Sequence, residues 1–369
     1  MRVRAVLLQN YRNLKNCAVE PSAGVNVICG DNAQGKTNFL ESMWIFTGGR
    51  SFRGAKDREL VAFGEHFAKA FFTAESFGRE QNLQVAITPG GKREVTVNKV
   101  PQESASALVG RFCAVVFSPV HLALVKEGPG VRRKFLDTAI CQIQPKYAKQ
   151  ILRYNHILSQ RNSLLRDLKK SNKFESTLEI WDEKIAECAA TLLLKRQTFV
   201  GALKPSAAKF YEGLSAGRET MSLQYRPSVQ TGPGETEEAL KWEIFKKFEQ
   251  LRQEDIAAGF TTRGPHRDDL EIKINGKSAR QFSSQGQQRS AVLAMKLAKA
   301  ELIQRKIGEP PVILLDDVLS ELDATRQSYL LNSIAEKQVF ITCCERDLGK
   351  KLAAGAVFTV EQGEIRAEL

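Results

Sequence analysis

The apolar positions of the first 120 residues fall into short runs that have the length of β-strands. Val25 to Cys29 (VNVIC) and Phe112 to Pro119 (FCAVVFSP) are compact apolar runs, which predict buried strands. The opening segment VRAVLLQNYRNLKNCAVEP predicts two strands joined by a polar turn around Asn13 to Asn16. Ala68 to Val100 alternates in short runs around Pro89–Gly90–Gly91, a hairpin signal. This part of the chain is therefore predicted to contain a small antiparallel sheet in addition to buried strands.

From Gly128 onward the pattern changes to the period of amphipathic helices. The segments YAKQILRYNHILSQRNSLLRDL and STLEIWDEKIAECAATLLLKRQTFV each carry an apolar stripe at helical spacing. Two long helices in succession predict a helical hairpin or arm. Ser215 to Glu238 is rich in Gly, Pro, Ser and Thr, which indicates a loop or a small β element, and KWEIFKKFEQLRQEDIAAG predicts a further helix that stops at Gly259.

The last third of the chain returns to a mixture of strands and helices. DLEIKINGKSARQF alternates around Asn275–Gly276, a strong hairpin signal. SQGQQRSAVLAMKLAKAELI begins with polar capping residues and continues as a long helix, and VILLDD predicts a buried strand that ends in two carboxylates. QVFITCCERD and AVFTVEQGEIRAEL predict two more strands with a helix between them.

A phosphate-binding loop follows the strand at Val25 to Cys29. Gly30 to Thr37 (GDNAQGKT) fits G-x-x-x-x-G-K-[ST], in which two glycines let backbone N–H groups turn toward phosphate oxygens. Lys36 can reach the β- and γ-phosphates, and the Thr37 hydroxyl can ligate Mg²⁺. Asn38 to Phe46 predicts a helix whose N-terminus adds its dipole to the anion site. A glycine-rich turn without a nucleotide is the alternative, and the strand, loop and helix in succession favour a nucleotide.

Two further segments belong with this loop. Asp316 and Asp317 end a buried strand, where the second half of a P-loop nucleotidase places its Mg²⁺-binding acid. Ser283 to Gln288 (SSQGQQ) precedes that strand. Because the middle of the chain separates these segments from the loop, we predict a discontinuous nucleotide domain of residues 1–125 and 265–369. Residues 126–264 are predicted to form a mainly helical, basic insertion domain.

The charge of the chain favours a polyanionic partner. The net charge is +12, and nucleic acid is the first candidate, with an anionic membrane surface or a general solubility effect as the alternative. The insertion has a one-sided excess of cations, which suits a surface that contacts the phosphates of a nucleic acid. The alternative is that these cations lie on a solvated helix face. Between Gly128 and Phe174 the acids are Asp137 and Asp167. The cations are Arg132, Arg133, Lys134, Lys146, Lys149, Arg153, Arg161, Arg166, Lys169, Lys170 and Lys173.

Composition excludes several classes of protein. No stretch approaches the ~20 apolar residues that span a bilayer, and the N-terminal segment MRVRAVLLQNYR lacks the features of a signal peptide. Seven cysteines include no C-x-x-C pair, and the adjacent Cys343 and Cys344 look like buried small residues. We therefore expect a cytoplasmic protein with free thiols, without a disulfide framework, a zinc site or a membrane partner.

The order of these motifs resembles the ABC-type ATPases, and more narrowly their SMC superfamily. In that group an S-x-G-Q signature stands ahead of the acidic strand, as Ser284, Gly286 and Gln287 do here, and SELD (Ser320 to Asp323) matches the D-loop. The insertion has room for one short helical arm, whereas SMC proteins carry coiled coils hundreds of residues long. Seven segments occur in the same order as in the bacterial RecF family, namely GDNAQGKTN, GRSFR, FSP, RRKFLD, GPHRDD, SSQGQQR and LLDDVLSELD. The resemblance spans essentially the full chain and implies an α/β ABC-type P-loop ATPase head, a mixed sheet with helices, split by the insertion.

The resemblance implies ATP and Mg²⁺ as cofactors and assigns residues to them. Lys36 and the loop amides would hold the triphosphate, Thr37 and Asp316 would hold Mg²⁺, and Asp317 would orient or deprotonate the attacking water. The signature residues would approach the γ-phosphate on a second subunit, and Arg12 and Asn13 would line the phosphate site. The nucleotide-binding candidates are Arg12, Asn13, Gly30, Asp31, Asn32, Ala33, Gln34, Gly35, Lys36, Thr37, Asn38, Ser284, Gly286, Gln287 and Asp323.

The function that the resemblance implies is ATP-dependent DNA binding in recombinational repair and replication-fork maintenance. It includes an ATP-driven homodimer on single- and double-stranded DNA at gaps, a weak DNA-dependent ATPase that resets the dimer, and recombinase loading with RecO and RecR. The alternative is a structural DNA clamp in which hydrolysis is incidental. Two departures stand out. Thr342 and Cys343 occupy the place where the superfamily usually has a switch histidine, and no glutamine loop is evident near Ser118 to His121.

Overall fold

The computed structural model describes residues 1–170, 177–230, 236–344 and 355–368, which form two compact units. Unit 1 comprises Met1–Leu122, Lys209–Glu219 and Gln288–Leu369, and unit 2 comprises Ala123–Ala208 and Thr220–Gln287. The predicted domain ranges differ from these units chiefly in two segments, because residues 265–287 lie in unit 2 and residues 209–219 lie in unit 1. One boundary of each segment falls inside a continuous helix, α5 (Leu178–Leu214) or α9 (Gln285–Ile307). A sequence pattern gives no signal for a domain boundary within a helix.

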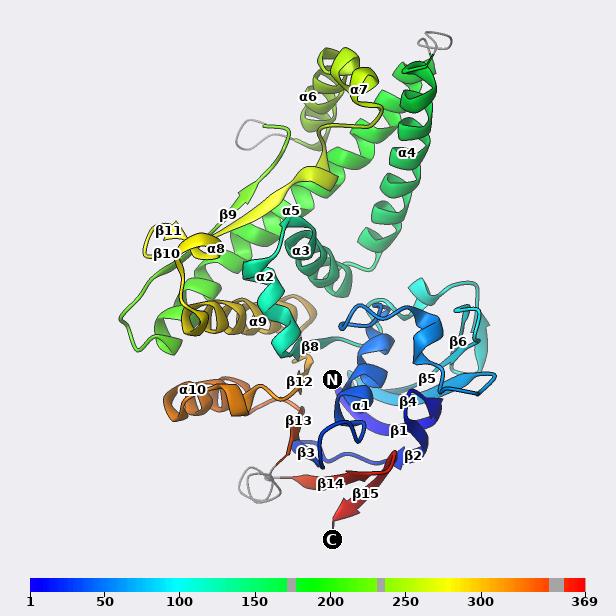
Figure 1. Cartoon of the computed structure of the whole chain (residues 1–369), viewed down its shortest axis with the longest axis vertical. Helices are drawn as coiled ribbons and strands as arrows, with labels where there is room; N and C mark the ends of the chain where they lie inside the picture. Colours follow the sequence, from blue (N-terminus) through cyan, green and yellow to red (C-terminus); the bar gives the residue numbers. More distant parts are fainter. Residues whose placement is uncertain (171–176, 231–235, 345–354, 369) are drawn as a thin grey trace. The chain divides into compact units, whose positions relative to one another are not determined.

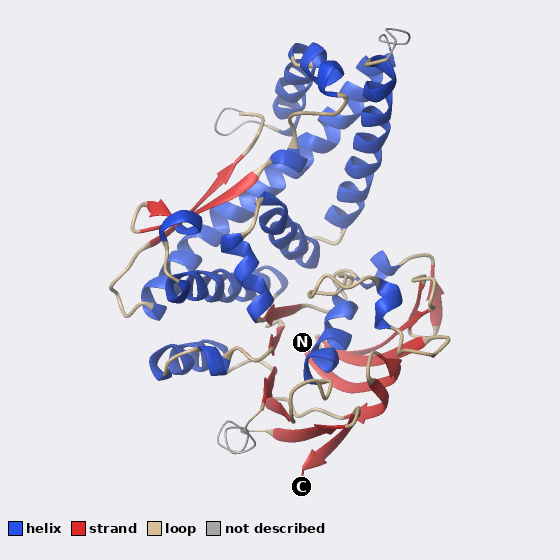
Figure 2. Cartoon of the chain, in the orientation of Figure 1, coloured by secondary structure: helices blue, strands red, loops and turns tan. Residues whose placement is uncertain are grey.

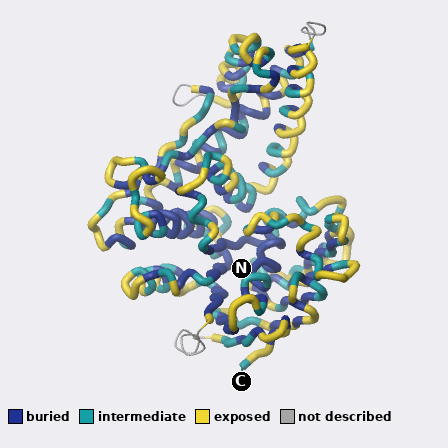
Figure 3. Tube along the Cα trace, viewed as in Figure 1, coloured by how far each residue is buried: buried dark blue, intermediate teal, exposed yellow. Residues whose placement is uncertain are grey.

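A largely parallel sheet forms the centre of unit 1 (Figures 1 and 2). Its described strands run in the order β15 (Glu364–Glu368), β14 (Ala356–Glu361), β3 (Val25–Cys29), β13 (Val339–Cys343), β12 (Val312–Leu315) and β8 (Ala114–Phe117). All neighbours are parallel except β14 and β15. Every residue of β8, β12 and β13 is buried, as expected for parallel strands covered on both faces (Figure 3). The residues that follow β3, β8, β12 and β13 therefore meet at one edge of the sheet.

An antiparallel sheet makes up the rest of the β structure of unit 1. Its order is β2 (Leu14–Val19), β1 (Arg2–Tyr11), β4 (Ala68–Ser76), β5 (Arg79–Ile87), β6 (Arg93–Val97) and β7 (Val100–Gln102). Alternate residues are buried, such as Ala68, Ala70, Phe72 and Ala74 of β4, because one face packs on the core. The predicted hairpin around Pro89–Gly90–Gly91 is confirmed as the β5–β6 connection.

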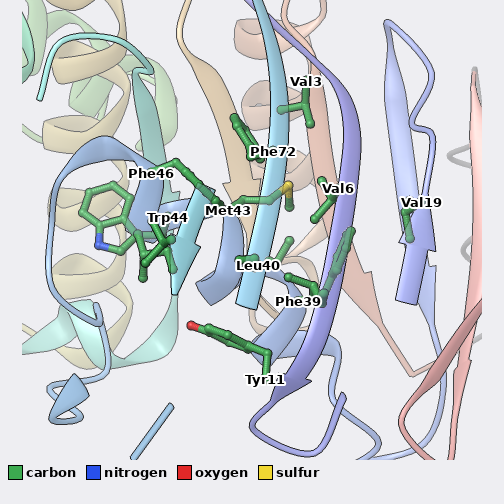
Figure 4. Packing of buried hydrophobic residues seen from close by; sticks show 14 of the residues in the cluster. Val3, Val6, Tyr11, Val19, Phe39, Leu40, Met43, Trp44, Phe46 and Phe72 are labelled. Carbon is green, nitrogen blue, oxygen red and sulfur yellow. The ribbon is translucent and has the colours of Figure 1, made fainter. Parts of the chain in front are cut away.

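Helix α1 (Lys36–Trp44) contributes to the hydrophobic core that the antiparallel sheet also lines. Phe39, Leu40 and Met43 are fully buried and lie beside Val6 and Phe72 of that sheet (Figure 4). Phe72 also contacts Phe46 at a ring-centroid distance of 4.6 Å. Each such side chain contributes about 1.5 to 3 kcal/mol of burial free energy, so the start of α1 is fixed by its own apolar face. The other short helices of unit 1 are η1 (Ile45–Thr47), η2 (Asp57–Leu60), η3 (Ala105–Leu108), η4 (Pro119–Leu122), η7 (Leu319–Glu321) and α10 (Ala324–Ile334).

Unit 2 is mainly helical (Figure 2). It contains α2 (Ala123–Lys126), α3 (Pro129–Ile143), α4 (Lys146–Leu168), most of α5, α6 (Glu237–Gln250), α7 (Arg252–Ala258), η6 (Pro265–Arg267) and α8 (Ala279–Phe282). A small antiparallel sheet joins β9 (Met221–Arg226), β10 (Asp269–Ile274) and β11 (Lys277–Ser278), so the predicted hairpin at Asn275–Gly276 is confirmed. The two long predicted helices are confirmed as α4 and α5.

Three elements differ from the sequence prediction. The single helix predicted to end at Gly259 is broken at Leu251 into α6 and α7, although Gly259 does end it in a left-handed conformation with φ 77°. AVFTVEQGEIRAEL forms a hairpin instead of one strand, because Gln362 and Gly363 both have positive φ and make a tight turn. The helix predicted between the last strands falls on residues 345–354, outside the described residues. Along the described chain, no helix combines the length and the apolar character required to span a membrane.

Candidate nucleotide-binding site

The loop between β3 and α1 has a backbone that only glycine fits at two positions. Gly30 has φ 153°, and a Cβ there would lie 2.4 Å from the carbonyl oxygen of Val360. Gly35 has φ 121°, and its Cβ would lie 2.7 Å from Leu14 Cδ2 and 2.8 Å from Asn13 Oδ1. The loop is therefore closely surrounded by β14 and by the β1–β2 turn, and the two glycines of the motif are required by space as well as by φ.

Lys36 lies across this loop with its ammonium group turned inward. Its Nζ donates to the carbonyl oxygens of Gly30 at 2.7 Å and Asp31 at 3.0 Å, and to Cys344 Sγ at 3.3 Å. The side chain is buried in a loop that begins a helix, where N–H groups and the helix dipole attract an anion. An ammonium group held at this place can contact the outer phosphates of a nucleotide.

Asp316 lies beside the start of α1, as its predicted role requires. Thr37 Oγ1 donates to Asp316 Oδ1 at 2.7 Å, and Ser118 Oγ donates to Asp316 Oδ2 at 3.0 Å. Burial raises the pKa of Asp316, and the hydrogen bonds from Thr37 and Ser118 oppose that rise. A buried carboxylate next to a hydroxyl is an oxygen donor pair that suits Mg²⁺.

The protein groups at this place would complete only part of a magnesium coordination shell. Within the described residues no cluster of three or more His, Cys, Asp or Glu side chains could hold a metal ion. Thr37 and Asp316 offer two oxygen ligands, and Mg²⁺ sites commonly combine one or two protein ligands with water and substrate phosphates. The residues present therefore fit a metal ion that arrives with a nucleotide.

Asp317 has an uncommon backbone conformation at the end of the acidic strand. Its φ is 50°, in the left-handed region that side chains other than glycine seldom adopt. Its backbone N–H donates to Thr342 Oγ1 at 2.9 Å, and that hydroxyl lies 3.4 Å from one carboxylate oxygen of Asp316 and one of Asp317. Thr342 thus contacts both acids from the end of β13, in the neighbourhood where the sequence shows no switch histidine.

The two residues of the predicted Arg12–Asn13 pair contact different parts of the site. Asn13 Nδ2 donates to the carbonyl oxygen of Ala33 at 3.0 Å, and Asn13 Oδ1 accepts from Asn38 Nδ2 at 2.7 Å, so Asn13 contacts the loop directly. Arg12 instead forms an ion pair with the fully buried Glu41 of α1, at 2.9 Å between Nε and Oε2. In this structure the Arg12 guanidinium anchors the turn to α1.

The remaining loop residues are held by segments from the end of the chain. Gln34 Oε1 accepts from the backbone N–H of Gln362 at 2.8 Å, and Asn32 Oδ1 accepts from Cys344 Sγ at 3.2 Å. Asp31, Asn32 and Ala33 are exposed. The β14–β15 turn therefore contacts the loop, a contact that no local sequence pattern predicts.

The signature residues start helix α9 in unit 2. Ser284 Oγ accepts from the backbone N–H of Gln287 at 3.2 Å, and Gln287 Oε1 accepts from that of Ser284 at 2.7 Å, a reciprocal capping arrangement. Gly286 lies between them. Asp323 of the D-loop segment in unit 1 caps α10 by accepting from the Arg326 N–H at 2.9 Å. That hydrogen bond, with the Arg326 charge, lowers the pKa of Asp323.

Sequence reasoning missed or misjudged several residues near the loop. Ser118 and Thr342 have no site role in the sequence prediction, yet both contact Asp316. A serine directly after a buried strand is the available signal for the first of them. The prediction that Cys343 and Cys344 are both buried is wrong for Cys344, which is exposed. Cys343 lies 3.2 Å from Cys29, sulfur to sulfur, and its contact with Cys29 and its burial raise the pKa of the Cys343 thiol.

Some cations of the insertion serve its interior. Arg132 is buried and pairs with Asp269 at 2.6 Å, and Arg161 is fully buried between Asp182 at 2.8 Å and Asp255 at 2.6 Å. A charge in the interior needs such partners, so neither arginine belongs to a phosphate-following surface or to a solvated face. Lys173 of the same group lies outside the described residues.

Comparisons with known proteins agree along the whole chain. The family model of the RecF/RecN/SMC N terminal domain matches residues 2–366. The chain is 41% identical to the DNA replication and repair protein RecF of Ruminiclostridium cellulolyticum over 97% of both chains. It is 39% identical to RecF of Listeria monocytogenes over 99% of this chain and 100% of that one.

Solved structures give the same picture. The recombination mediator protein RecF with ATP, of the RecFOR pathway, superimposes with a TM-score of 0.92 at 36% identity, covering 100% of this chain and 97% of that chain. The Smc head domain of Pyrococcus furiosus superimposes with a TM-score of 0.54 at 15% identity over 99% of this chain and 95% of that chain, a likeness of fold alone. The predicted α/β class and ATPase-head fold are confirmed.

Proposed function

The chain belongs to the RecF family of DNA replication and repair proteins, and from that premise we propose that it binds ATP and DNA in recombinational repair. One observation carries the proposal. Thr37 at the start of α1 and Asp316 at the end of β12 lie 2.7 Å apart, oxygen to oxygen, beside a loop shaped for phosphate. This is the pairing of a phosphate loop with a metal-binding acid on which P-loop ATPases depend.

The residues around the loop divide the work of holding ATP. The loop N–H groups and Lys36 bind the triphosphate, and Asn13 and Asn38 hold the loop in its binding shape. Thr37 and Asp316 hold Mg²⁺, with Ser118 fixing the second carboxylate oxygen of Asp316. When bound, Mg²⁺ neutralises charge that develops on the phosphate oxygens.

Asp317 is the residue that we propose to orient the attacking water. Its left-handed backbone turns it away from the direction that a continued strand would give, and Thr342 fixes its N–H. An aspartate is one methylene shorter than the glutamate usual at this place, and a threonine stands where a histidine is usual. Both features favour slow turnover, so the protein is proposed to be a weak, DNA-dependent ATPase.

Association of two copies is the proposed output of ATP binding. Ser284, Gly286 and Gln287 lie at the start of α9 and are exposed or half-buried, and in this proposal they approach the γ-phosphate held by a second copy. A nucleotide that contacts two copies stabilises the homodimer by mass action, and hydrolysis resets it. We place this cycle on single- and double-stranded DNA at gaps, in the cytoplasm, together with RecR and RecO during recombinase loading.

A structural DNA clamp is the second candidate. It is favoured by Asp317 and Thr342, because these residues stand where a catalytic glutamate and a switch histidine are usual. Asp317→Asn separates the two. The ATPase proposal expects steady-state ATP hydrolysis to fall at least about 100-fold, since a lost general base costs 10²–10⁴-fold, while ATP affinity is kept. Asp317→Glu restores the usual carboxylate and is the matched control that retains turnover.

The same variant tests the purpose of hydrolysis. In the ATPase proposal, DNA complexes of Asp317→Asn formed with ATP dissociate more slowly than those of the wild type, and repair in cells is impaired. DNA release and repair at wild-type levels without hydrolysis would establish the clamp instead.

A further inference from the structure

We propose that one face of unit 2 binds the phosphate backbone of DNA, an inference that rests on the DNA-binding function proposed above. The face is formed by Arg166 and Lys169 at the end of α4 and by Phe260, Arg263 and Arg267 in the loop after α7. We name it the α4–α7 cationic surface. It differs from the nucleotide site, and all its residues belong to one compact unit.

The backbone of its loop is fixed from the interior side. The hydroxyl and the N–H of Thr261 both donate to Asn162 Oδ1, at 2.7 and 2.8 Å, and the Thr261 hydroxyl accepts from the buried Arg161 at 2.7 Å. Thr262 donates its N–H and its hydroxyl to Asp255 Oδ1 at 2.8 and 2.7 Å. The residues on the N-terminal side of Arg263 are therefore fixed by the buried Arg161 and Asp255 and by the half-buried Asn162.

The residues between the two arginines are fixed in the same way. Gly264 exchanges hydrogen bonds with Ser228 Oγ, both at 2.8 Å, and the Pro265 carbonyl accepts from Arg196 at 2.6 Å. The ring of His266 joins Tyr154 OH at 2.6 Å to the carbonyl of Thr261 at 3.0 Å. Because the loop is already ordered, little of its conformational entropy is lost when a ligand binds.

The two acids of this segment already have partners within unit 2. Asp268 accepts from Tyr225 and from the Ser228 N–H, and lies 3.7 Å from Arg196. Asp269 pairs with Arg132 at 2.6 Å. Arg263 and Arg267 are exposed, and in the described part of the chain neither has a carboxylate within salt-bridge distance. The loop thus turns its acids inward and presents two uncompensated guanidinium groups outward.

An aromatic ring and two further cations lie at the start of the same loop. The guanidinium of Arg267 lies 5.1 Å from the ring centroid of Phe260, which is 42% exposed. A Cβ built on Gly259 would lie 3.4 Å from Lys169 Cδ and 3.8 Å from Arg166 Cγ, so the end of α4 adjoins the residue that precedes Phe260. Arg166 and Lys169 are exposed, and the exposed acids of α4 and α7 are Asp167 and Glu254. The surface therefore carries an excess of positive charge around an aromatic ring.

The chemistry of this surface fits a nucleic-acid strand. Guanidinium groups bind phosphate oxygens through paired N–H donors, and an exposed ring offers a stacking face for an unpaired base. Each strand of duplex DNA carries one phosphate per ~3.4 Å of helix axis, so several exposed cations of one surface can each bind a phosphate. The net charge of +12 supports a polyanion over a neutral partner.

The test compares two double variants of the full-length protein with ATP, by fluorescence anisotropy of labelled single-stranded and duplex oligonucleotides. Arg263→Gln with Arg267→Gln removes the unpaired arginines. Arg153→Gln with Arg226→Gln is the matched control, because these side chains are 50% and 51% exposed but paired with Glu187 and Glu271. Binding is measured between about 0.05 and 0.2 M salt, where each phosphate contact contributes about 0.9 to the log–log slope on duplex DNA.

We expect the first variant to lose about 2 from the slope and at least about tenfold in affinity at 0.1 M salt, and the control to keep both. Arg263→Lys with Arg267→Lys keeps the charge and should keep most of the slope. Equal losses in the two Gln variants would show a net-charge effect only and overturn the proposal. Unchanged binding in the first variant would also overturn it and would leave the surface to an acidic protein segment. A wild type that binds no DNA would overturn the proposed function itself.

Discussion

Asp316 is surrounded by hydroxyl groups from three different elements. Thr37 comes from α1, Ser118 follows β8 and Thr342 belongs to β13, and their oxygens lie 2.7, 3.0 and 3.4 Å from the Asp316 carboxylate. Burial raises the pKa of this acid, and the three hydroxyl donors oppose that rise by stabilising its ionised form. Thr37 was predictable from its motif, whereas the other two hydroxyls become neighbours only when β8, β12 and β13 pair in parallel.

Ser118→Ala tests whether this arrangement serves the metal ion. We expect the affinity for ATP in the presence of Mg²⁺ to fall by roughly five- to tenfold, because a hydrogen bond to a charged group contributes about 1.5 to 3 kcal/mol and water regains part of it. Binding of ATP without Mg²⁺ should be unchanged. The measurement is a titration with a fluorescent ATP analogue at several Mg²⁺ concentrations. Ser104→Ala, an exposed serine of unit 1, is the control, and an unaltered Mg²⁺ dependence in Ser118→Ala would contradict this role.

At the scale of elements, periodicity predicted most strands and helices but not how they end or touch. The alternation of β4, β5 and β6 and the apolar run of β3 gave the correct elements, since a half-buried or fully buried strand must show such patterns. The break at Leu251 and the tight turn at Gln362–Gly363 were missed. The turn at Gly363 packs against the β1–β2 turn, where a Cβ on Gly363 would lie 2.1 Å from the Asn13 carbonyl oxygen.

The loop at His266 gives unit 2 a dependence on pH. Burial lowers the pKa of His266 to about 4 from its usual value of 6.5. The unfolded chain therefore binds more protons between pH 6.5 and pH 4, and stability present above pH 6.5 is lost as the pH falls through this window. At about 1.4 kcal/mol per pH unit, the loss approaches about 3 kcal/mol at pH 4.

Urea unfolding between about pH 4 and pH 7, followed by tryptophan fluorescence, measures this effect. His266→Gln should flatten the dependence of the unfolding free energy on pH, because the neutral amide cannot take up the proton. His156→Gln, an exposed histidine on α4, should keep the slope of the wild type. Equal slopes for His266→Gln and the wild type would show that this ring does not couple the loop to pH.

At the scale of the whole molecule, the proposed ATPase residues belong to both units. The phosphate loop, Asp316 and Asp317 belong to unit 1, and Ser284 to Gln287 belong to unit 2. Their order along the chain was enough to predict an ATPase head interrupted by an insertion, because each motif is local in sequence. The interior positions of Arg132 and Arg161 could not be predicted from the sequence, because a charge count does not distinguish a buried cation from an exposed one.

The central claim is that ATP at the phosphate loop controls the pairing of two copies. Sedimentation velocity of the DNA-bound protein with ATP, with ADP and without nucleotide measures that pairing directly. Lys36→Arg is the variant to compare, because it keeps a positive charge but changes the group that donates to the Gly30 and Asp31 carbonyls. We predict that the wild type sediments as a dimer with ATP only, and that Lys36→Arg remains folded and monomeric throughout. Dimers that form equally without ATP, or a stable ATP-dependent dimer of Lys36→Arg, would contradict the claim.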